Sequence, residues 1–114
     1  MLAFWLTCLL EAPWWLCCLH AEPSEARRPA SRRILIALVL TGVLNLLTHP
    51  VVWRVTAGGT ATTWLLAELA AVLVEVSVAA VVLHRWGVRH PLVTAGLYGI
   101  GANATSALVG VLFF

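Results

Sequence analysis

The amino-acid sequence predicts an all-α fold, a transmembrane four-helix bundle. The first observation behind this prediction is composition: of 114 residues, 61% are hydrophobic and 11% are charged, and the mean hydropathy is +0.95. A soluble domain has roughly half of its residues apolar and about a quarter charged, so it could not bury this much apolar surface. The second observation is that four apolar runs, joined by short polar segments, take up nearly the whole chain.

The four apolar runs cover residues 2–19, 34–53, 64–84 and 92–114. Each has about 18 to 23 residues, the number that a helix rising about 1.5 Å per residue needs to cross a hydrocarbon layer of about 30 Å. A helix also pairs its backbone groups internally, as contact with lipid requires. Because the connecting segments are short, successive helices are expected to be antiparallel neighbours in an up-down-up-down bundle. The chain, residues 1–114, is then a single membrane domain.

Arginines distinguish the two ends of the predicted bundle. The segments 21–33 and 85–91 carry six of the seven basic residues, all of them arginines, and the segment 54–63 carries only Arg54. Short cytoplasmic loops have an excess of positive charge, so loops 21–33 and 85–91 are expected in the cytoplasm, with both termini outside the cell membrane. Arginines confined to two loops form no continuous basic face, which argues against a nucleic-acid partner.

Tryptophans are distributed in agreement with this orientation. Amphipathic indole rings favour the two membrane–water interfaces. Three of them are expected near the outer interface and three towards the inner one; these are Trp5, Trp53 and Trp64, and Trp14, Trp15 and Trp86 respectively.

Polar side chains interrupt every apolar run. An ionisable side chain at the bilayer centre costs a few kcal/mol on insertion scales, so such residues usually face the bundle interior and mark a function. Carboxylates and imidazole bind and release protons and cations. The polar residues inside the runs are Glu11, then Asn45, Thr48 and His49, then Glu68 and Glu75, and finally Asn103, Thr105 and Ser106.

Counting from the ends of each run places one polar residue per helix near the midplane of the membrane. His49 lies one helical turn, about 6 Å, outward of Asn45, and Glu68 lies two turns, about 10 Å, outward of Glu75. A polar ladder is therefore expected from the midplane to the outer surface, and it is our candidate binding site for a proton or a bound cation. Its members are Glu11, Asn45, His49, Glu68, Glu75 and Asn103.

A weak internal repeat relates the two halves of the chain. The pattern N-x-x-[ST] occurs at Asn45 and again at Asn103, in each case after a helix that contains glutamate. Glu11 precedes Asn45 by nearly the same separation as Glu68 precedes Asn103, with Glu75 as the other candidate. Two helical hairpins related by an axis along the membrane normal would produce this pattern, as in transporters built from parallel repeats.

Small residues follow two stripes along the last run. Such stripes let helix backbones approach each other in a membrane. One stripe is expected to pack within the bundle and the other against a second copy, which predicts a homo-oligomer or a larger membrane complex. The stripes are Ala95, Gly99 and Asn103, and Ala102, Ser106 and Gly110.

Several of these features together resemble a group of small, functionally uncharacterised prokaryotic four-helix membrane proteins. The most specific part is the string N-x-x-T-H-P-x-x-W at residues 45–53, and the other parts are Glu11-Ala12-Pro13, Glu68 with Glu75, and Asn103 with Ser106 and Gly110. The resemblance covers nearly the whole chain. It implies the four-helix architecture and suggests that the polar residues belong together, but it brings no activity, cofactor or catalytic residue.

Three functions are consistent with the sequence. In the first, the polar ladder carries a proton or cation in transport, which needs an oligomer because four helices enclose little space. In the second, the polar side chains are hydrogen bonds between helices of a structural or assembly subunit. In the third, His49, Glu68 and Glu75 hold a metal ion in an intramembrane enzyme, with an open position for water. Neither H-E-x-x-H nor a serine–histidine pairing is present, so the sequence favours a non-enzymatic role.

Overall fold

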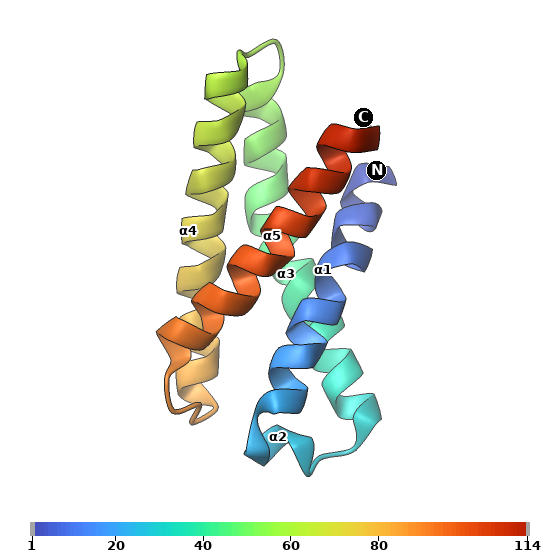
Figure 1. Cartoon of the computed structure of the whole chain (residues 1–114), viewed down its shortest axis with the longest axis vertical. Coiled ribbons are helices and arrows are strands. Elements are labelled where there is room, and N and C mark those ends of the chain that lie inside the picture. The colour runs from blue at the N-terminus through green and yellow to red at the C-terminus, as the bar shows by residue number, and fades with distance from the viewer. Residues whose placement is uncertain (1, 114) are drawn as a thin grey trace.

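The computed structural model describes residues 2–113 and is all-α, as predicted (Figure 1). Four of its helices are long and apolar enough to cross a membrane. Each of them overlaps one of the four predicted spans. The short helix in the first connection was not predicted. The helices are α1 (Leu2–Ala21), α2 (Pro23–Ala26), α3 (Ala30–Thr56), α4 (Ala61–Arg85) and α5 (Pro91–Phe113).

The long helices extend beyond the predicted apolar runs. The helix α3 begins at Ala30, before the apolar run starts at Ile34, and it includes two arginines in its first turns. The helix α4 begins at Ala61, where the Thr60 hydroxyl accepts a hydrogen bond of 3.2 Å from the Thr63 backbone N–H. Such a cap satisfies one of the free donors at a helix start. An apolar run marks contact with hydrocarbon, whereas backbone hydrogen bonding continues past it, so the helices are longer than the runs.

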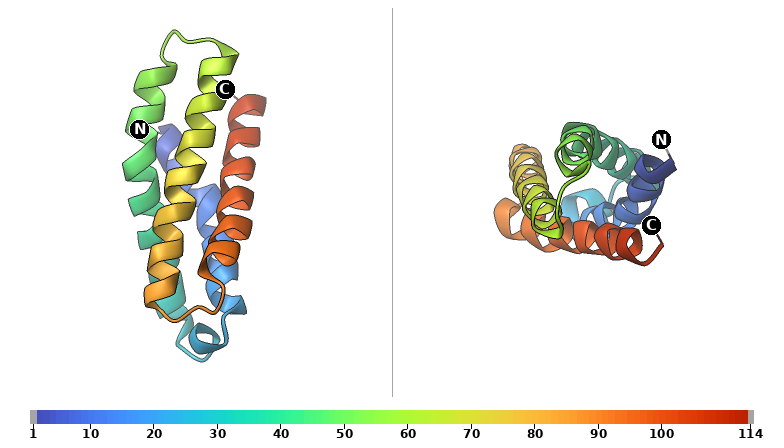
Figure 2. Two further views of the ribbon diagram at one scale, coloured as in Figure 1. Left: turned by 90° about the vertical axis from the view of Figure 1, so that its left-hand side faces the viewer. Right: turned by 90° about the horizontal axis from the view of Figure 1, so that it is seen from above.

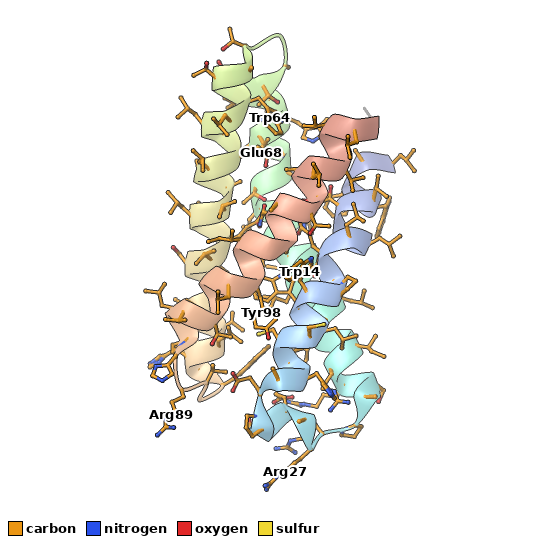
Figure 3. All side chains as sticks on the ribbon, viewed as in Figure 1. Trp14, Arg27, Trp64, Glu68, Arg89 and Tyr98 are labelled. Atoms are coloured by element: carbon orange, nitrogen blue, oxygen red, sulfur yellow. The ribbon has the colours of Figure 1, made fainter. Side chains whose placement is uncertain are left out.

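The four long helices form a ring in which each helix has two neighbours. The helix α1 packs against α3 and α5, and α4 packs against the same two helices (Figure 2). Both termini and the α3–α4 connection lie at one end of the bundle, which we call the terminal end. The other two connections, residues 22–29 and 86–90, lie at the opposite, arginine end, where Arg27 and Arg89 project (Figure 3). The molecule measures 47 × 24 × 19 Å, long enough to cross a bilayer of about 40–45 Å.

The outer surface of the bundle is apolar. Large aliphatic side chains point outward along every long helix; for example, Leu73 is 70% exposed and Leu97 is 68% exposed. A soluble protein rarely exposes such continuous apolar surface, whereas lipid solvates it. The chain is therefore a multi-pass membrane protein.

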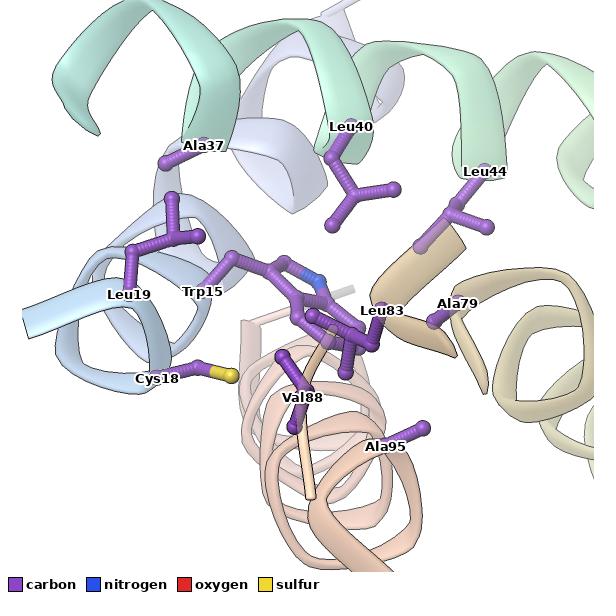
Figure 4. Close-up of a cluster of buried hydrophobic side chains, with 10 residues drawn as sticks. All are labelled: Trp15, Cys18, Leu19, Ala37, Leu40, Leu44, Ala79, Leu83, Val88 and Ala95. Atoms are coloured by element: carbon purple, nitrogen blue, oxygen red, sulfur yellow. The ribbon is translucent and has the colours of Figure 1, made fainter. Parts of the chain in front are cut away.

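Trp15 fills the interior of the half nearer the arginine end, which we call the packed half. Its indole is 1% exposed and lies among buried side chains from all four long helices (Figure 4). The prediction that Trp15 lies at the inner membrane interface is wrong, because α1 turns this side chain into the bundle. The buried cluster around it consists of Cys18, Leu19, Ala37, Leu40, Leu44, Ala79, Leu83, Val88 and Ala95.

The packed half is closed at the arginine end by the turn between α4 and α5. Gly87 adopts a positive φ of 78°, a conformation that glycine adopts without steric cost. The Val88 N–H bonds to the Leu83 carbonyl and the Gly87 N–H to the His84 carbonyl, both at 3.0 Å. This is a Schellman motif, whose usual hydrophobic contact falls between Val88 and Leu83. Both of these side chains belong to the buried cluster, so the turn also completes the core.

Two arginines of the first connection hold α2 against the start of α3. The Arg32 guanidinium forms an ion pair of 3.3 Å with Glu25. The Arg33 guanidinium donates to the carbonyls of Ala26 at 2.8 Å and Glu25 at 3.3 Å. These side chains therefore order the connection in addition to contributing positive charge at the arginine end.

Both small-residue stripes of α5 are used inside the bundle. Ala95 and Ala102 are fully buried, and a Cβ added to Gly99 would lie 3.0 Å from Val76 on α4. Ser106, on the second stripe, bonds to α1. Contact of one of the stripes with another copy of the chain stays a prediction.

Candidate functional site

Two buried carboxylates lie at the centre of the bundle, and each accepts hydrogen bonds from two neighbouring helices. Glu11 on α1 accepts from Asn45 Nδ2 at 2.7 Å and from Ser106 Oγ at 2.8 Å. Glu75 on α4 accepts from Asn103 Nδ2 at 2.6 Å and from Thr48 Oγ1 at 2.5 Å. Glu11 is 1% exposed and Glu75 is 3% exposed. All four carboxylate oxygens therefore have a donor.

These four hydrogen bonds form a closed ring around the bundle, which we call the carboxylate ring. One bond crosses each of the four helix contacts: α1 to α3, α3 to α4, α4 to α5, and α5 to α1. The sequence predicted that one polar residue per helix meets near the midplane, and the structure brings those residues together. The ring joins them through six side chains, namely Glu11, Asn45, Thr48, Glu75, Asn103 and Ser106.

The carboxylate ring has approximate two-fold symmetry. Exchanging α1 with α4 and α3 with α5 turns each bond of the ring into another: each glutamate accepts from the asparagine of its own hairpin and from the hydroxyl of the other hairpin. The equivalent of Glu11 is Glu75. The pairing of Glu68 with Asn103, suggested by the sequence separations, is wrong because Glu75 is the residue that contacts Asn103.

Each asparagine amide is oriented by two acceptors. Besides its glutamate, Asn45 Nδ2 donates to the Thr41 carbonyl at 3.0 Å, and Asn103 Nδ2 donates to the Gly99 carbonyl at 3.1 Å. Since both acceptors require N–H donors, the NH₂ group of each amide must point towards the glutamate. The ring is thereby anchored to the backbones of α3 and α5.

Two members of the ring, Thr48 and Ser106, were not among the predicted site residues. Both were visible as polar interruptions, and both stand at the last position of the N-x-x-[ST] pattern. A spacing of three places this hydroxyl on the face that its asparagine occupies. The repeat was therefore the signal for both residues. Thr105 is also one of the polar interruptions noted in the sequence, but it lies outside the ring and accepts a hydrogen bond of 3.1 Å from the Trp14 indole N–H.

A cavity of about 530 Å³ lies between the carboxylate ring and the terminal end. The ring forms its floor, and residues near the ends of the helices, such as Ala3, Ala57 and Val111, form its mouth. No arginine of the described residues lines this cavity. We call the surrounding part of the bundle the open half. The cavity therefore leads from one end of the bundle to two buried carboxylates with no basic guanidinium beside them.

His49 and Glu68, the outer members of the predicted ladder, lie in the wall of the cavity. The His49 ring packs between Phe4, at a centroid distance of 6.1 Å, and Trp53, at 5.9 Å. Glu68 follows Trp64 on α4 (Figure 3), and both line the cavity together with Glu75. All six predicted site residues thus line one cavity, but only four of them belong to the ring. Binding of a proton or cation by these residues stays a prediction.

The predicted metal ligands are not gathered into a metal centre. Within residues 2–113, no group of three or more His, Cys, Asp and Glu side chains is arranged to hold a metal ion. Glu75 is committed to Thr48 and Asn103 in the ring, and His49 packs against aromatic rings in the wall. The geometry therefore gives no support to His49, Glu68 and Glu75 as a ligand set.

Comparisons of the chain with protein-family models, with curated proteins and with solved structures found no match. The sequence and the geometry of the carboxylate ring and its cavity therefore carry the functional argument.

Proposed function

We propose that this protein moves protons or cations across the membrane and that Glu11 and Glu75 are the binding groups. The observation that supports this most is that an open cavity ends on two buried carboxylates with no arginine beside them. Buried glutamates are expensive in a membrane and usually mark a site of ion or proton transfer. A cation at the cavity floor is attracted by both carboxylates, and low polarity around them strengthens that attraction.

The structure would represent the state that is open to the terminal end. Towards the arginine end, Trp15 and its buried cluster fill the interior. Transport through this chain therefore requires a rearrangement that opens the packed half and closes the open half, as in alternating access. The approximate symmetry of the ring relates the two hairpins, each of which supplies one carboxylate. This supports a rearrangement in which one hairpin rocks against the other around the carboxylates.

We propose that the arginine end faces the cytoplasm and that the cavity opens to the outside. The clustering of arginines at that end supports this orientation under the positive-inside rule. We also propose that the chain is related to the small prokaryotic four-helix membrane proteins that its sequence resembles. The string that carries it supplies Asn45, Thr48, His49 and Trp53 to the lining of the cavity, so the resemblance is concentrated at the proposed site.

Flux measurements on purified protein in liposomes would test this function. We expect the wild-type protein to dissipate a proton or monovalent-cation gradient. We expect Glu75→Gln to reduce that flux at least tenfold. Glutamine has nearly the shape of glutamate, and its amide can still accept from Asn103 and donate to Thr48, so the variant should insert and fold normally. The matched control is Glu22→Gln, which removes a carboxylate outside the described cavity lining. Unchanged flux in Glu75→Gln would disprove the proposed role of Glu75.

A structural or assembly subunit is the second candidate. Complete hydrogen bonding favours it: among residues 2–113, no buried side-chain nitrogen or oxygen lacks a partner. Interhelical hydrogen bonds of this kind contribute on the order of 0.6 kcal/mol each, up to about 2. Under this function, wild-type liposomes would show no flux of protons or monovalent cations above that of empty liposomes, and the protein would co-purify with other membrane proteins in a defined ratio.

A further inference from the structure

The cavity of the open half is far larger than a bare metal ion or a proton requires. Its volume of about 530 Å³ lies within the range of about 300–1,000 Å³ that is typical of sites for small organic molecules. The lining also changes along its length. The polar ring forms the floor, whereas much of the wall consists of small and apolar side chains, including Ala3, Val52, Ala71 and Ala107. Such a wall suits an organic body better than a shell of ordered water.

Aromatic side chains line the cavity between the ring and the mouth. Trp53 and Trp64 both contribute, from α3 and α4, and His49 lies against Trp53. Trp64, Glu68 and Glu75 follow each other on one face of α4 at helical spacing. Indole faces attract cations through the ring quadrupole and also pack against flat apolar groups. The wall therefore combines aromatic surface with a nearby carboxylate.

Glu68 differs from the two carboxylates of the floor in being uncommitted. Both oxygens of Glu11 and of Glu75 already accept hydrogen bonds. Within the described residues 2–113, the one ion pair is that of Arg32 with Glu25. The hydrogen bonds between side chains of these residues do not include the half-buried Glu68. Its counterpart under the symmetry of the ring is Phe4, an apolar residue whose ring packs against His49. Glu68 therefore departs from the two-fold pattern and adds negative charge to one side of the wall.

We propose that the cavity binds an organic cation, with its ammonium group paired to Glu68 and its apolar body against Trp53 and Trp64. This inference rests on the proposed function, since it names the class of molecule that enters the cavity from the terminal end. Three carboxylates and no arginine in the lining disfavour anions. The apolar wall disfavours small hydrated ions as the only ligand. An aromatic ammonium compound can pair its charge with a carboxylate and pack its ring against the apolar wall.

Calorimetric titration of the full chain in lipid nanodiscs would test the proposal with benzyltrimethylammonium as the probe. We expect saturable binding of one probe per chain, and at least tenfold weaker binding of tetramethylammonium, which lacks the ring. The uncharged isostere neopentylbenzene should not displace the probe. Equal binding of tetramethylammonium, displacement by neopentylbenzene, or absence of saturable probe binding would each overturn the proposal.

Two variants would localise the binding. Glu68→Gln is expected to weaken binding of benzyltrimethylammonium at least tenfold, with Glu22→Gln as the matched control. Trp64→Leu is expected to weaken it severalfold, with Trp5→Leu as its control, because Trp5 is 64% exposed on the outer surface. Wild-type affinity in both cavity variants would contradict the assignment. If either variant fails to fold, as judged by gel filtration, the other still decides the outcome.

Binding and flux would be measured separately, so that the two proposals can fail independently. Flux that depends on Glu75 without binding of benzyltrimethylammonium would leave the transport function in place and remove the organic cation. Saturable binding that depends on Glu68, in a protein that moves neither protons nor cations, would support the site and contradict transport.

Discussion

The packed half and the open half of the bundle are built from the same four helices but are filled in opposite ways. Towards the arginine end, Trp15 occupies the space between the helices, with Leu40, Leu44 and Leu83 around it. Towards the terminal end, the interior positions carry small side chains such as Ala71, Ala107 and Gly110, and a cavity remains. The carboxylate ring lies between the two halves. Side-chain size therefore decides which half is closed.

The two halves are also stabilised by different interactions, namely side-chain packing in the packed half and interhelical hydrogen bonds at the floor of the open half. Helices in a membrane associate through close packing and interhelical hydrogen bonds, because lipid is as apolar as the protein interior. The packed half relies on contacts of Trp15, which touch α3, α4 and α5 at once. The open half lacks such a core, and the carboxylate ring ties its helices together at the cavity floor. We expect changes in the packed half to affect mainly stability and changes in the open half to affect mainly binding.

Trp15→Ala should have the largest effect on stability. Replacing a buried tryptophan by alanine costs about 3 to 5 kcal/mol in well-packed interiors, since the cavity left behind is only partly refilled. The free energy of unfolding, measured by denaturant titration in detergent micelles, should fall by that amount. Trp5→Ala is the control, with little expected change for an exposed side chain. A loss below about 1 kcal/mol for Trp15→Ala would show that the two halves are packed alike.

The substitutions Ala79→Leu and Ala107→Leu form a matched pair that compares the two halves directly. Ala79 is completely buried in the core, and inserting a larger side chain into a filled interior costs about 1 to 3 kcal/mol. Ala107 lines the cavity, so a leucine at this position enters empty space. The free energy of unfolding should then change by no more than about 0.5 kcal/mol. Ala107→Leu should also reduce ligand binding by filling the cavity. Equal destabilisation by both variants would contradict the distinction between the halves.

Asn45→Ala and Asn103→Ala should have smaller and similar effects, because the two asparagines occupy equivalent places in the ring. Each variant leaves one glutamate oxygen without a donor, at a cost of about 1 to 2 kcal/mol. Ser77→Ala serves as the control; its hydroxyl bonds only to its own helix, at the Leu73 carbonyl. Unfolding free energies that differ by more than about 1 kcal/mol between the two asparagine variants would argue against the two-fold symmetry of the ring.

The sequence by itself determined the fold class, the four spans and the depth of the polar residues. Hydropathy identifies the spans because lipid requires continuous apolar helices, and a constant rise per residue converts position along a span into depth. On this basis Glu11, Asn45, Glu75 and Asn103 were expected at one level, and they meet in the ring. The number of helical turns from Asn45 and Glu75 also placed His49 and Glu68 outward of the ring, where they line the cavity.

Only the tertiary structure decided which side chains meet and where space remains. Depth does not specify the rotation of a helix about its axis or the neighbours that it faces, since these depend on packing against other helices. Hence the sequence left Glu68 and Glu75 as alternatives for Asn103, assigned Trp15 to the interface, and left Thr48 and Ser106 outside the site. The cavity follows from the same cause. Small residues along α5 predict close contact with a neighbouring helix. Whether the space beside them is filled depends on the residues of α1, α3 and α4 that face them.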